Sequence, residues 1–446
     1  MRILILWFLL SPLFLSACAR NSPYRDQSDG IACEISVPET MTSTHSESAA
    51  ALEKETCPNA VKVRIVGKHP YELAYVEINE HGFFVDRMQV ESALDMAGAP
   101  FDSKNGGHVR VLVFVHGWHH DASAGDKNVK GFHEALAALS RWSPNDEIRG
   151  VYIGWRGDSL ALPMLRILTF WDRERTSDEV GRGSSLYEFF MRLEQVVKGE
   201  PPTQNRLVVI GHSFGASVVF NSLSQLYMQR LLDGIYASGE MPKFQGYGDL
   251  VVFINPAIEA RRYMPFKIVL SDYVMRQQTS GADSSNGVKP VLLILSSEGD
   301  WATRKAYRMA RILSTIIETY RPADSIGSAR DQGLFNKWVM KLKAIGDHEA
   351  FKTHEVIHLV SGSKTPQPKE CPPLPKEDFD RLLRVSAEGV GQGFPGSGVV
   401  LKPKQDVTLA NLPYWNAELG KEIISGHTDI WNLNLICWIS QLAESQ

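Results

Sequence analysis

The chain lacks the features that mark nucleic-acid-binding, repeat and membrane-spanning proteins. It has 47 Lys and Arg against 51 Asp and Glu, a net charge of −4, and no long basic run, which argues against nucleic acid as a partner. No internal repeat runs through its 446 residues. The apolar run at residues 3–15 is shorter than the ~20 residues that a helix needs to cross a bilayer. With 43% hydrophobic and 22% charged residues, the composition is typical of a globular enzyme.

The short apolar run is typical of an export signal. Arg2 precedes it, and it ends in Leu15-Ser16-Ala17-Cys18, which resembles the lipobox of bacterial lipoproteins. This resemblance implies a signal peptide over residues 1–17, cleavage before Cys18 and acylation of its thiol. The alternative is a plain secretory signal that is cut nearby.

The lipobox resemblance implies an exported protein that is lipid-anchored to a bacterial membrane, because acyl chains partition into the bilayer. Ala19, in place of the Asp that retains lipoproteins at the inner membrane, favours the outer membrane, facing the periplasm. Residues 18–58 are rich in Ser, Thr and Glu, and we predict that they form a flexible tether.

Cysteine is scarce, and none of the five cysteines lies in a Cys-x-x-Cys pair, which argues against a zinc finger or a thiol-redox site. Apart from Cys18, the chain contains Cys33, Cys57, Cys371 and Cys437. Four cysteines in an oxidising compartment allow three pairings. Proximity in the sequence favours Cys33 with Cys57 and Cys371 with Cys437, but it does not decide between disulfides and buried thiols.

Apolar strands alternate with amphipathic helices along the rest of the chain. This alternation predicts an α/β fold with a mostly parallel central sheet and helices on both faces. We assign residues 59–446 to one catalytic domain, with a helical insertion near 159–200 and an irregular, Pro- and Gly-rich insertion near 361–412. The predicted strands are 61–66, 72–78, 109–115, 148–153, 206–210, 250–254, 291–295 and 356–360, the last as the final central strand.

A glycine-flanked serine follows one of these strands directly. Strand 206–210 continues into Gly211-His212-Ser213-Phe214-Gly215, and a helix is predicted from residue 216. Chance alone produces Gly-x-Ser-x-Gly in roughly one chain in five of this composition, so the pentapeptide is weak by itself. Its place between a buried strand and a helix is that of a nucleophile elbow, which exposes the serine hydroxyl at the carboxyl end of a sheet.

Other polar groups also follow predicted strands. His116-Gly117-Trp118 comes after strand 109–115, Asp300 comes after strand 291–295, and His427 lies near the C-terminus. The order serine, carboxylate, histidine is that of a nucleophile, an acid and a base. Glu298 and Glu259 are alternatives to Asp300.

On these motifs, the stretch from Val109 to Trp431 resembles the α/β-hydrolase superfamily, in particular bacterial esterase- or lipase-like members with an HGW oxyanion motif. The resemblance implies an α/β-hydrolase fold and hydrolysis of a carboxylic ester through an acyl-enzyme on Ser213, without a metal or other cofactor. His427 is the implied general base, and Asp300 orients it. The ester is a small molecule or a lipid, and the oligomeric state stays open.

The resemblance also implies an oxyanion hole formed by two backbone N–H groups, those of Trp118 and Phe214. Gly117, Gly211 and Gly215 support the two turns, and His116 is expected to brace its turn.

Two patterns suggest other functions. His354-Glu355-Val356-Ile357-His358 matches the H-E-x-x-H motif of zinc peptidases, which needs a helix. The β-branched residues there favour a strand instead, in which the two histidines would lie about 13 Å apart. His116, His119, His120 and Asp121 form a second potential metal cluster, although pocket or turn-bracing roles fit them better. A non-catalytic binding protein on a hydrolase scaffold is the third alternative.

Overall fold

The computed structural model describes residues 22–38, 45–101, 107–158, 170–199, 203–236, 244–280, 289–315, 337–359, 366–387, 392–404 and 412–444. The predicted signal peptide and Cys18 lie outside these residues, as do parts of both predicted insertions. No helix in these ranges is long and apolar enough to cross a membrane.

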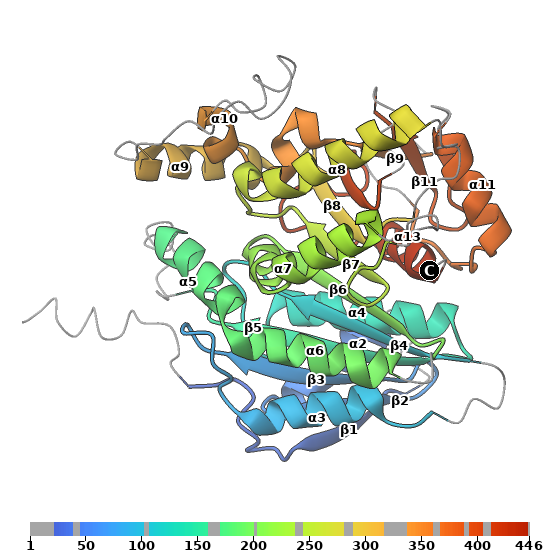
Figure 1. The fold of residues 1–446 in the computed structure, drawn as a ribbon. Coiled ribbons are helices and arrows are strands. Elements are labelled where there is room, and N and C mark those ends of the chain that lie inside the picture. The colour runs from blue at the N-terminus through green and yellow to red at the C-terminus, as the bar shows by residue number, and fades with distance from the viewer. Residues whose placement is uncertain are drawn as a thin grey trace, which may run out of the picture.

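One sheet of twelve strands runs through the described molecule (Figure 1), in the order β1-β2-β3-β5-β4-β6-β7-β8-β12-β9-β11-β10. All neighbours from β3 to β9 are parallel, and among the named strands of the described residues the antiparallel pairs are β2 with β3, β9 with β11, and β11 with β10. The predicted mostly parallel α/β sheet is therefore confirmed. The strands are β1 Ala32–Ser36, β2 Lys62–Val66, β3 Tyr71–Ile78, β4 Val109–Val115, β5 Glu147–Trp155, β6 Arg206–His212, β7 Leu250–Ile254, β8 Leu292–Ser297, β9 His354–His358, β10 Gln392–Gly393, β11 Val399–Pro403 and β12 Tyr414–Leu419.

Helices cover both faces of the sheet, as the continuous apolar strands predict. One apolar core lies between the sheet and α3, α5, α6, α7 and α8, and the other lies between the sheet and α2, α4, α11 and α13. The helices are α2 His45–Thr56, α3 Arg87–Gly98, α4 Lys127–Trp142, α5 Phe170–Arg182, α6 Ser184–Lys198, α7 Phe214–Tyr236, α8 Ala260–Ser280, the π-helix η2 Ala302–Tyr307, α9 Arg308–Thr315, α10 Lys337–Leu342, the 3-10 turns η3 Ile345–Asp347 and η4 Glu349–Phe351, α11 Lys376–Ala387 and α13 Leu433–Glu444.

The prediction of a flexible tether over 18–58 is wrong for residues 22–38 and 45–58. This segment forms β1, which pairs with β2, and α2, which packs on α4. The Cys33–Cys57 disulfide joins the two. A polar composition predicts a flexible segment only when that segment makes no contacts with the folded domain. Here the contacts are made with segments that lie elsewhere in the sequence, so composition alone does not reveal them.

The C-terminal part also differs from the prediction. Strand β9 is not the last central strand, because β12 follows it in the chain and inserts between β8 and β9. The segment predicted as irregular, 361–412, contains α11, β10 and β11. The Cys371–Cys437 disulfide joins it to α13.

Where the structure describes it, the predicted insertion near 159–200 belongs to the helical layer on one face of the sheet, because both α5 and α6 contribute to its apolar core. Helix α6 is a core helix whose inward side chains are fully buried, as a crossover from β5 to β6 requires. Helix α5 lies towards the end of the sheet where the parallel strands finish (Figure 1).

Candidate functional site

The turn at Ser213 has the strained backbone that the sequence predicts for a nucleophile elbow. Strand β6 ends at His212, α7 begins at Phe214, and Ser213 between them has φ +54°, a left-handed conformation that costs free energy for a residue with a side chain. A Cβ on Gly211 would lie 2.7 Å from the Cα of Ala216, and one on Gly215 would lie 2.2 Å from the carbonyl oxygen of Val115. Only glycine fits at both positions, as the predicted elbow requires.

The structure brings Ser213, His427 and Asp300 into one chain of hydrogen bonds. The Nε2 atom of His427 lies 2.9 Å from Oγ of Ser213, and its Nδ1 atom lies 2.9 Å from Oδ2 of Asp300. Ser213 and Asp300 are buried, and the imidazole is 22% exposed. Three groups that are 87 and 127 residues apart in the chain therefore meet at the carboxyl ends of β6, β8 and β12.

Asp300 is held in its ionised form. Burial acts to raise the pKa of its carboxyl group, but the hydrogen bond and charge of His427, together with Thr303, outweigh burial and lower it. Thr303 donates to the carboxylate through its backbone N–H, at 3.1 Å, and through its hydroxyl, at 2.5 Å. Because Asp300 is an acceptor, Nδ1 of His427 carries a proton and Nε2 is free to accept the serine proton.

The loop after β4 lies directly against the serine. A Cβ on Gly117 would lie 2.8 Å from Cβ of Ser213 and 3.0 Å from the carbonyl oxygen of His212, so only glycine allows this approach. Trp118 is the next residue of this loop, and its ring lies 6.2 Å from that of Phe214. Phe214 is the first residue of α7, where backbone N–H groups have no acceptor within the helix. Both predicted oxyanion donors therefore belong to segments that flank Ser213.

His116 braces the turn, as predicted. Its Nε2 atom accepts the backbone N–H of Trp155 at 3.0 Å, so Nδ1 must be the protonated nitrogen that donates to the carbonyl of Gly117 at 2.9 Å. The ring also stacks on Trp155. Burial lowers the pKa of His116 to about 4, so the ring stays neutral and keeps this tautomer.

Two positioning residues were not predicted. His212 donates from Nε2 to the carbonyl oxygen of His427 at 2.9 Å, and Asn255, which follows β7, donates to the same oxygen at 3.2 Å. Asn255 also accepts the backbone N–H of Ser297 at 2.9 Å. Burial, and then the nearby His427, lower the pKa of His212 far below its usual value, so it stays a neutral donor. Only their position in the sequence could have indicated this role, because His212 ends β6 and Asn255 follows β7, the strand next to it.

Comparison of the chain with protein-family models, with curated proteins and with solved structures found no match.

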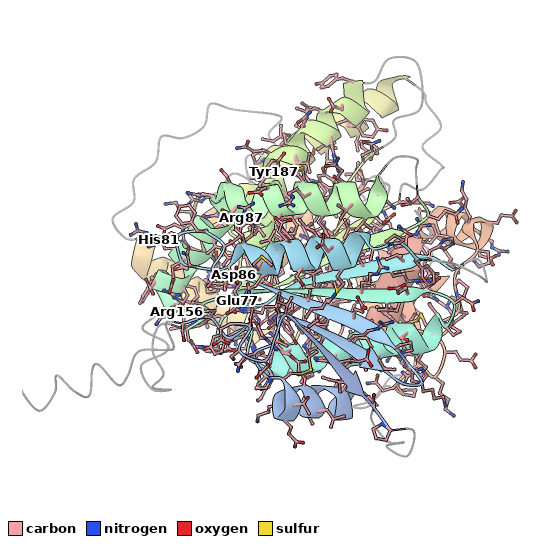
Figure 2. The ribbon with its side chains drawn as sticks, turned by 90° about the horizontal axis from the view of Figure 1, so that it is seen from below. Glu77, His81, Asp86, Arg87, Arg156 and Tyr187 are labelled. Carbon is pink, nitrogen blue, oxygen red and sulfur yellow. A yellow bond between two sulfur atoms is a disulfide. The ribbon has the colours of Figure 1, made fainter. Side chains whose placement is uncertain are left out.

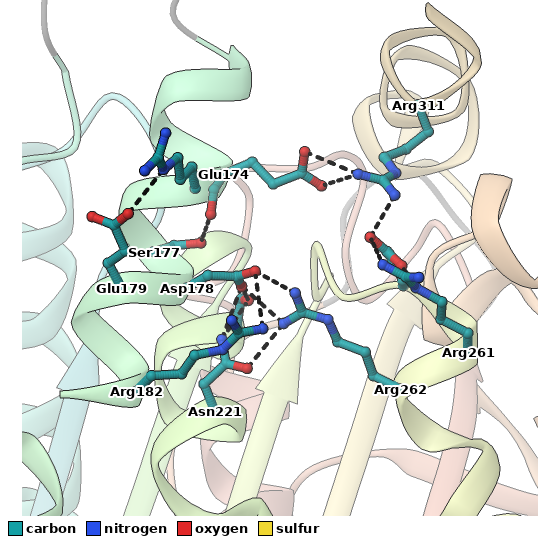
Figure 3. A network of polar contacts seen from close by, with 12 residues as sticks. Glu174, Ser177, Asp178, Glu179, Arg182, Asn221, Arg261, Arg262 and Arg311 are labelled. Carbon is teal, nitrogen blue, oxygen red and sulfur yellow. Dashed lines mark hydrogen bonds and ion pairs between the residues drawn. The ribbon is translucent and has the colours of Figure 1, made fainter. Parts of the chain in front are cut away.

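Neither alternative acid contacts His427. Glu298 is exposed. Glu259 is buried in ion pairs with Arg261 and with Arg311, whose guanidinium lies 2.5 Å away. Figure 3 shows the network that contains Arg311, in which α5 is joined to α9 by Glu174 and Arg311 and to α8 by Asp178 and Arg262. The carboxylates of this network hold helices together, and of the three candidate acids only Asp300 contacts His427.

An aromatic cluster lies beside the serine. Phe170, at the start of α5, lies 5.4 Å from Phe214, 5.6 Å from Trp118 and 6.0 Å from Tyr307, measured between ring centroids. Rings at these separations pack edge to face or tilted. They form an apolar wall beside the turn that carries Ser213.

The predicted metal patterns do not form a shared site. His354 and His358 lie on strand β9, where His354 contacts Trp415 and Thr353, so the helix that a zinc peptidase requires is not formed. His119 contacts Asp158 and His120 contacts Asp126, each through Nδ1. Among the described residues, no group of three potential metal ligands comes together.

Proposed function

We propose that this chain is a serine hydrolase of the α/β-hydrolase type, which cleaves carboxylic esters through an acyl-enzyme on Ser213. The observation that carries the proposal is the hydrogen-bonded chain from Ser213 through His427 to Asp300, built on a strained turn between a buried strand and a helix. A catalytic triad is recognised by this geometry and by these roles, whatever the positions of its members in the sequence.

The reaction follows from the proton positions. Oγ of Ser213 attacks the ester carbonyl carbon while Nε2 of His427 takes the hydroxyl proton, and Asp300 stabilises the imidazolium. The carbonyl oxygen becomes an oxyanion that accepts the N–H groups of Trp118 and Phe214. The intermediate then expels the alcohol, which leaves with the proton from Nε2. Water attacks the acyl-enzyme in the same manner, giving up its proton to Nε2, and the carboxylic acid is released from the regenerated serine.

The surroundings favour an apolar acyl group. Phe170, Trp118, Phe214 and Tyr307 pack together beside the turn that carries Ser213, and apolar surfaces recognise hydrocarbon chains through burial. This substrate class suits an esterase or lipase that is anchored to a bacterial membrane through Cys18, as the lipobox resemblance implies.

A fluorophosphonate probe tests the proposal. We expect it to label Ser213 with and without a metal chelator, and Ser213→Ala to abolish labelling and to lower ester turnover by at least about 10⁴-fold, with an unchanged far-ultraviolet circular dichroism spectrum. Ser217→Ala, in the next turn of α7, is the matched control. It should keep both probe labelling and ester turnover, because the hydroxyl of Ser217 donates to Asp178 and not to His427. Turnover that survives Ser213→Ala would rule out the mechanism, and a folded chain without any turnover would favour a binding protein.

A further inference from the structure

The chain enters the fold at the end of the sheet that holds the candidate site. Strands β3, β5, β4 and β6 are parallel, so the ends at Ile78 and Trp155 lie at the same end of the sheet as Ser213. Residues 22–24 line a surface cavity together with Ile78 and Trp155. Any anchor at Cys18 is therefore attached at the catalytic end of the molecule.

The entry point is held rigidly. The backbone N–H groups of Tyr24 and Arg25 both donate to the carboxylate of Glu77, at 3.0 and 2.8 Å. The side chain of Arg25 is fully buried, pairs with Glu53 at 2.5 Å and donates to the carbonyl of Ala122 at 2.7 Å. Figure 2 shows Glu77 and Arg156 close together at this end of the sheet. Cys18 precedes Ser22 by four residues, which span at most ~14 Å, so an acylated Cys18 would hold this end of the sheet close to the bilayer.

A cationic and apolar surface occupies the same end. The segment from Trp301 to Thr315 contains no acidic residue. Trp301 is 61% exposed and Met309 64% exposed, and Lys305 and Arg308 are exposed beside them. Arg304 and Arg311 turn inward to Glu418 and Glu259. An exposed helix surface that combines aromatic, apolar and basic side chains is suited to an anionic membrane surface.

Helix α5 connects this surface to the entry point. At its first turn, Nε1 of Trp171 donates to the carbonyl of Ala310 in α9 at 3.2 Å. At its last turn, α5 lies against the loop after β3: a Cβ on Gly82 of this loop would lie 3.2 Å from the carbonyl oxygen of Glu179. The same loop carries Phe83, which is 63% exposed. Exposed apolar side chains thus extend from the loop after β3 to α9.

We propose that this surface, which we call the rim (Phe83, Trp171, Trp301, Lys305, Arg308 and Met309), lies on the anionic bilayer that holds the acylated Cys18, and that the substrate is an ester of a lipid in that same bilayer. The inference rests on the proposed ester hydrolysis and lipid anchor. With the rim on the membrane, an acyl chain passes from lipid to the aromatic wall at Phe170 without crossing water, so its transfer avoids the cost of hydrating the chain.

Depth measurements test the orientation without using activity. The acylated full chain is placed in phosphatidylethanolamine and phosphatidylglycerol vesicles with a nitroxide on Met309→Cys or, as a control, on Lys376→Cys in α11, which lies on the opposite side of Figure 1. We expect lipid-phase oxygen to relax the label at position 309, and a water-soluble nickel chelate to relax the label at 376. Equal exposure of both labels to the nickel chelate would overturn the proposed orientation.

Turnover tests the substrate class. Arg308→Glu with Met309→Ser should lower hydrolysis of a vesicle-embedded lipid ester about tenfold and leave a water-soluble short-chain ester within about twofold. The control pair, Lys376→Glu with Tyr236→Ser, should change neither. If the variant hydrolysed both esters more slowly, or hydrolysed both at the unchanged rate, the proposed lipid substrate would be contradicted. The label depth should be the same in a Ser213→Ala background, because it does not depend on catalysis. A failure of the hydrolase proposal can therefore be distinguished from a failure of the proposed membrane orientation.

Discussion

At the scale of single residues, the carbonyl oxygen of His427 determines how the imidazole is placed. It accepts hydrogen bonds from His212 and Asn255, which stand at the ends of β6 and β7. Ser213 and His427 are thereby tied to the same two strands. Side chains that fix the orientation of a catalytic group affect rate more than binding.

Asn255→Asp should therefore lower kcat about tenfold to hundredfold and leave KM unchanged. Aspartate keeps the acceptor for Ser297 and tolerates the φ of +47° at this position, but it places a carboxylate oxygen against the carbonyls of Gly426 and His427. Steady-state kinetics on a short-chain ester and the rate of fluorophosphonate labelling measure the effect. A folded variant with unchanged kcat would show that Asn255 has no positioning role.

Gly117→Ala should lower kcat by at least about tenfold, because the new Cβ would lie 2.8 Å from Cβ of Ser213 and would push the oxyanion turn away. The matched control is Gly125→Ala in the same loop, where the nearest atom to a new Cβ is Cε of Lys54 at 3.6 Å. Kinetics of both variants on one ester make the comparison. The interpretation fails if the two substitutions have equal effects.

At the scale of elements, β1 and α2 are held in the fold by pairing with β2, by packing on α4 and by a buried polar network. The buried Arg25 and Glu53 share a network with Tyr75 and His133, whose Nε2 atom lies 2.5 Å from Glu53. Burial acts to raise the pKa of Glu53, but the charges of Arg25 and His133 outweigh it and lower it to about 2. Removing Glu53 would take away the ion-pair partner of the fully buried Arg25, so the entry segment depends on α2 for its place in the folded unit.

Removal of the Cys33–Cys57 disulfide should destabilise this corner by about 3 kcal/mol, since the bridge closes a loop with a sequence separation of 24. In Cys33→Ala with Cys57→Ala, hydrogen exchange should speed up in β1 and α2 and stay unchanged in β4 and β6. Ester turnover should persist, because the triad contacts neither element. Faster exchange in β6 would show that the corner is coupled to the site.

At the scale of the whole molecule, buried neutral histidines make stability depend on pH. Burial lowers the pKa of His116 to about 4, that of His348 to about 4 and that of His354 to about 3. Below pH 6.5 the unfolded chain binds protons that the folded chain does not, so stability falls as the pH drops from about 6.5 towards 4. Asp347 opposes this trend, because burial raises its pKa to about 6.

These three histidines and His212, whose pKa burial also lowers, outweigh the carboxyl groups of Asp347, Glu77 and Glu174, whose pKa values burial raises. Urea unfolding at pH 5 should therefore show a free energy lower than at pH 7 by on the order of 4 kcal/mol. His354→Gln should make the dependence shallower, as its ring is enclosed by Trp415 and Thr353. Equal stability at the two pH values would contradict the assignment of these histidines as buried and neutral.

The sequence by itself determined the local features. Alternation of apolar strands and helices predicted the mostly parallel sheet, because periodicity reflects burial on each face. The glycines around Ser213 and the polar residues that follow strands predicted which groups meet, because the carboxyl ends of parallel strands gather at one end of a sheet. Glycine requirements and strand ends are local properties, so one sequence suffices to recognise them.

The tertiary structure alone decided the choice of Asp300 over Glu259, the roles of His212 and Asn255, and the insertion of β12 between β8 and β9. It also decided that residues 22–38 and 45–58 belong to the folded unit, through partners such as Glu77 and Ala122. Each of these outcomes depends on contacts between segments tens to hundreds of residues apart. No local pattern records such contacts, because a side chain's partner is set by the packing of the whole chain.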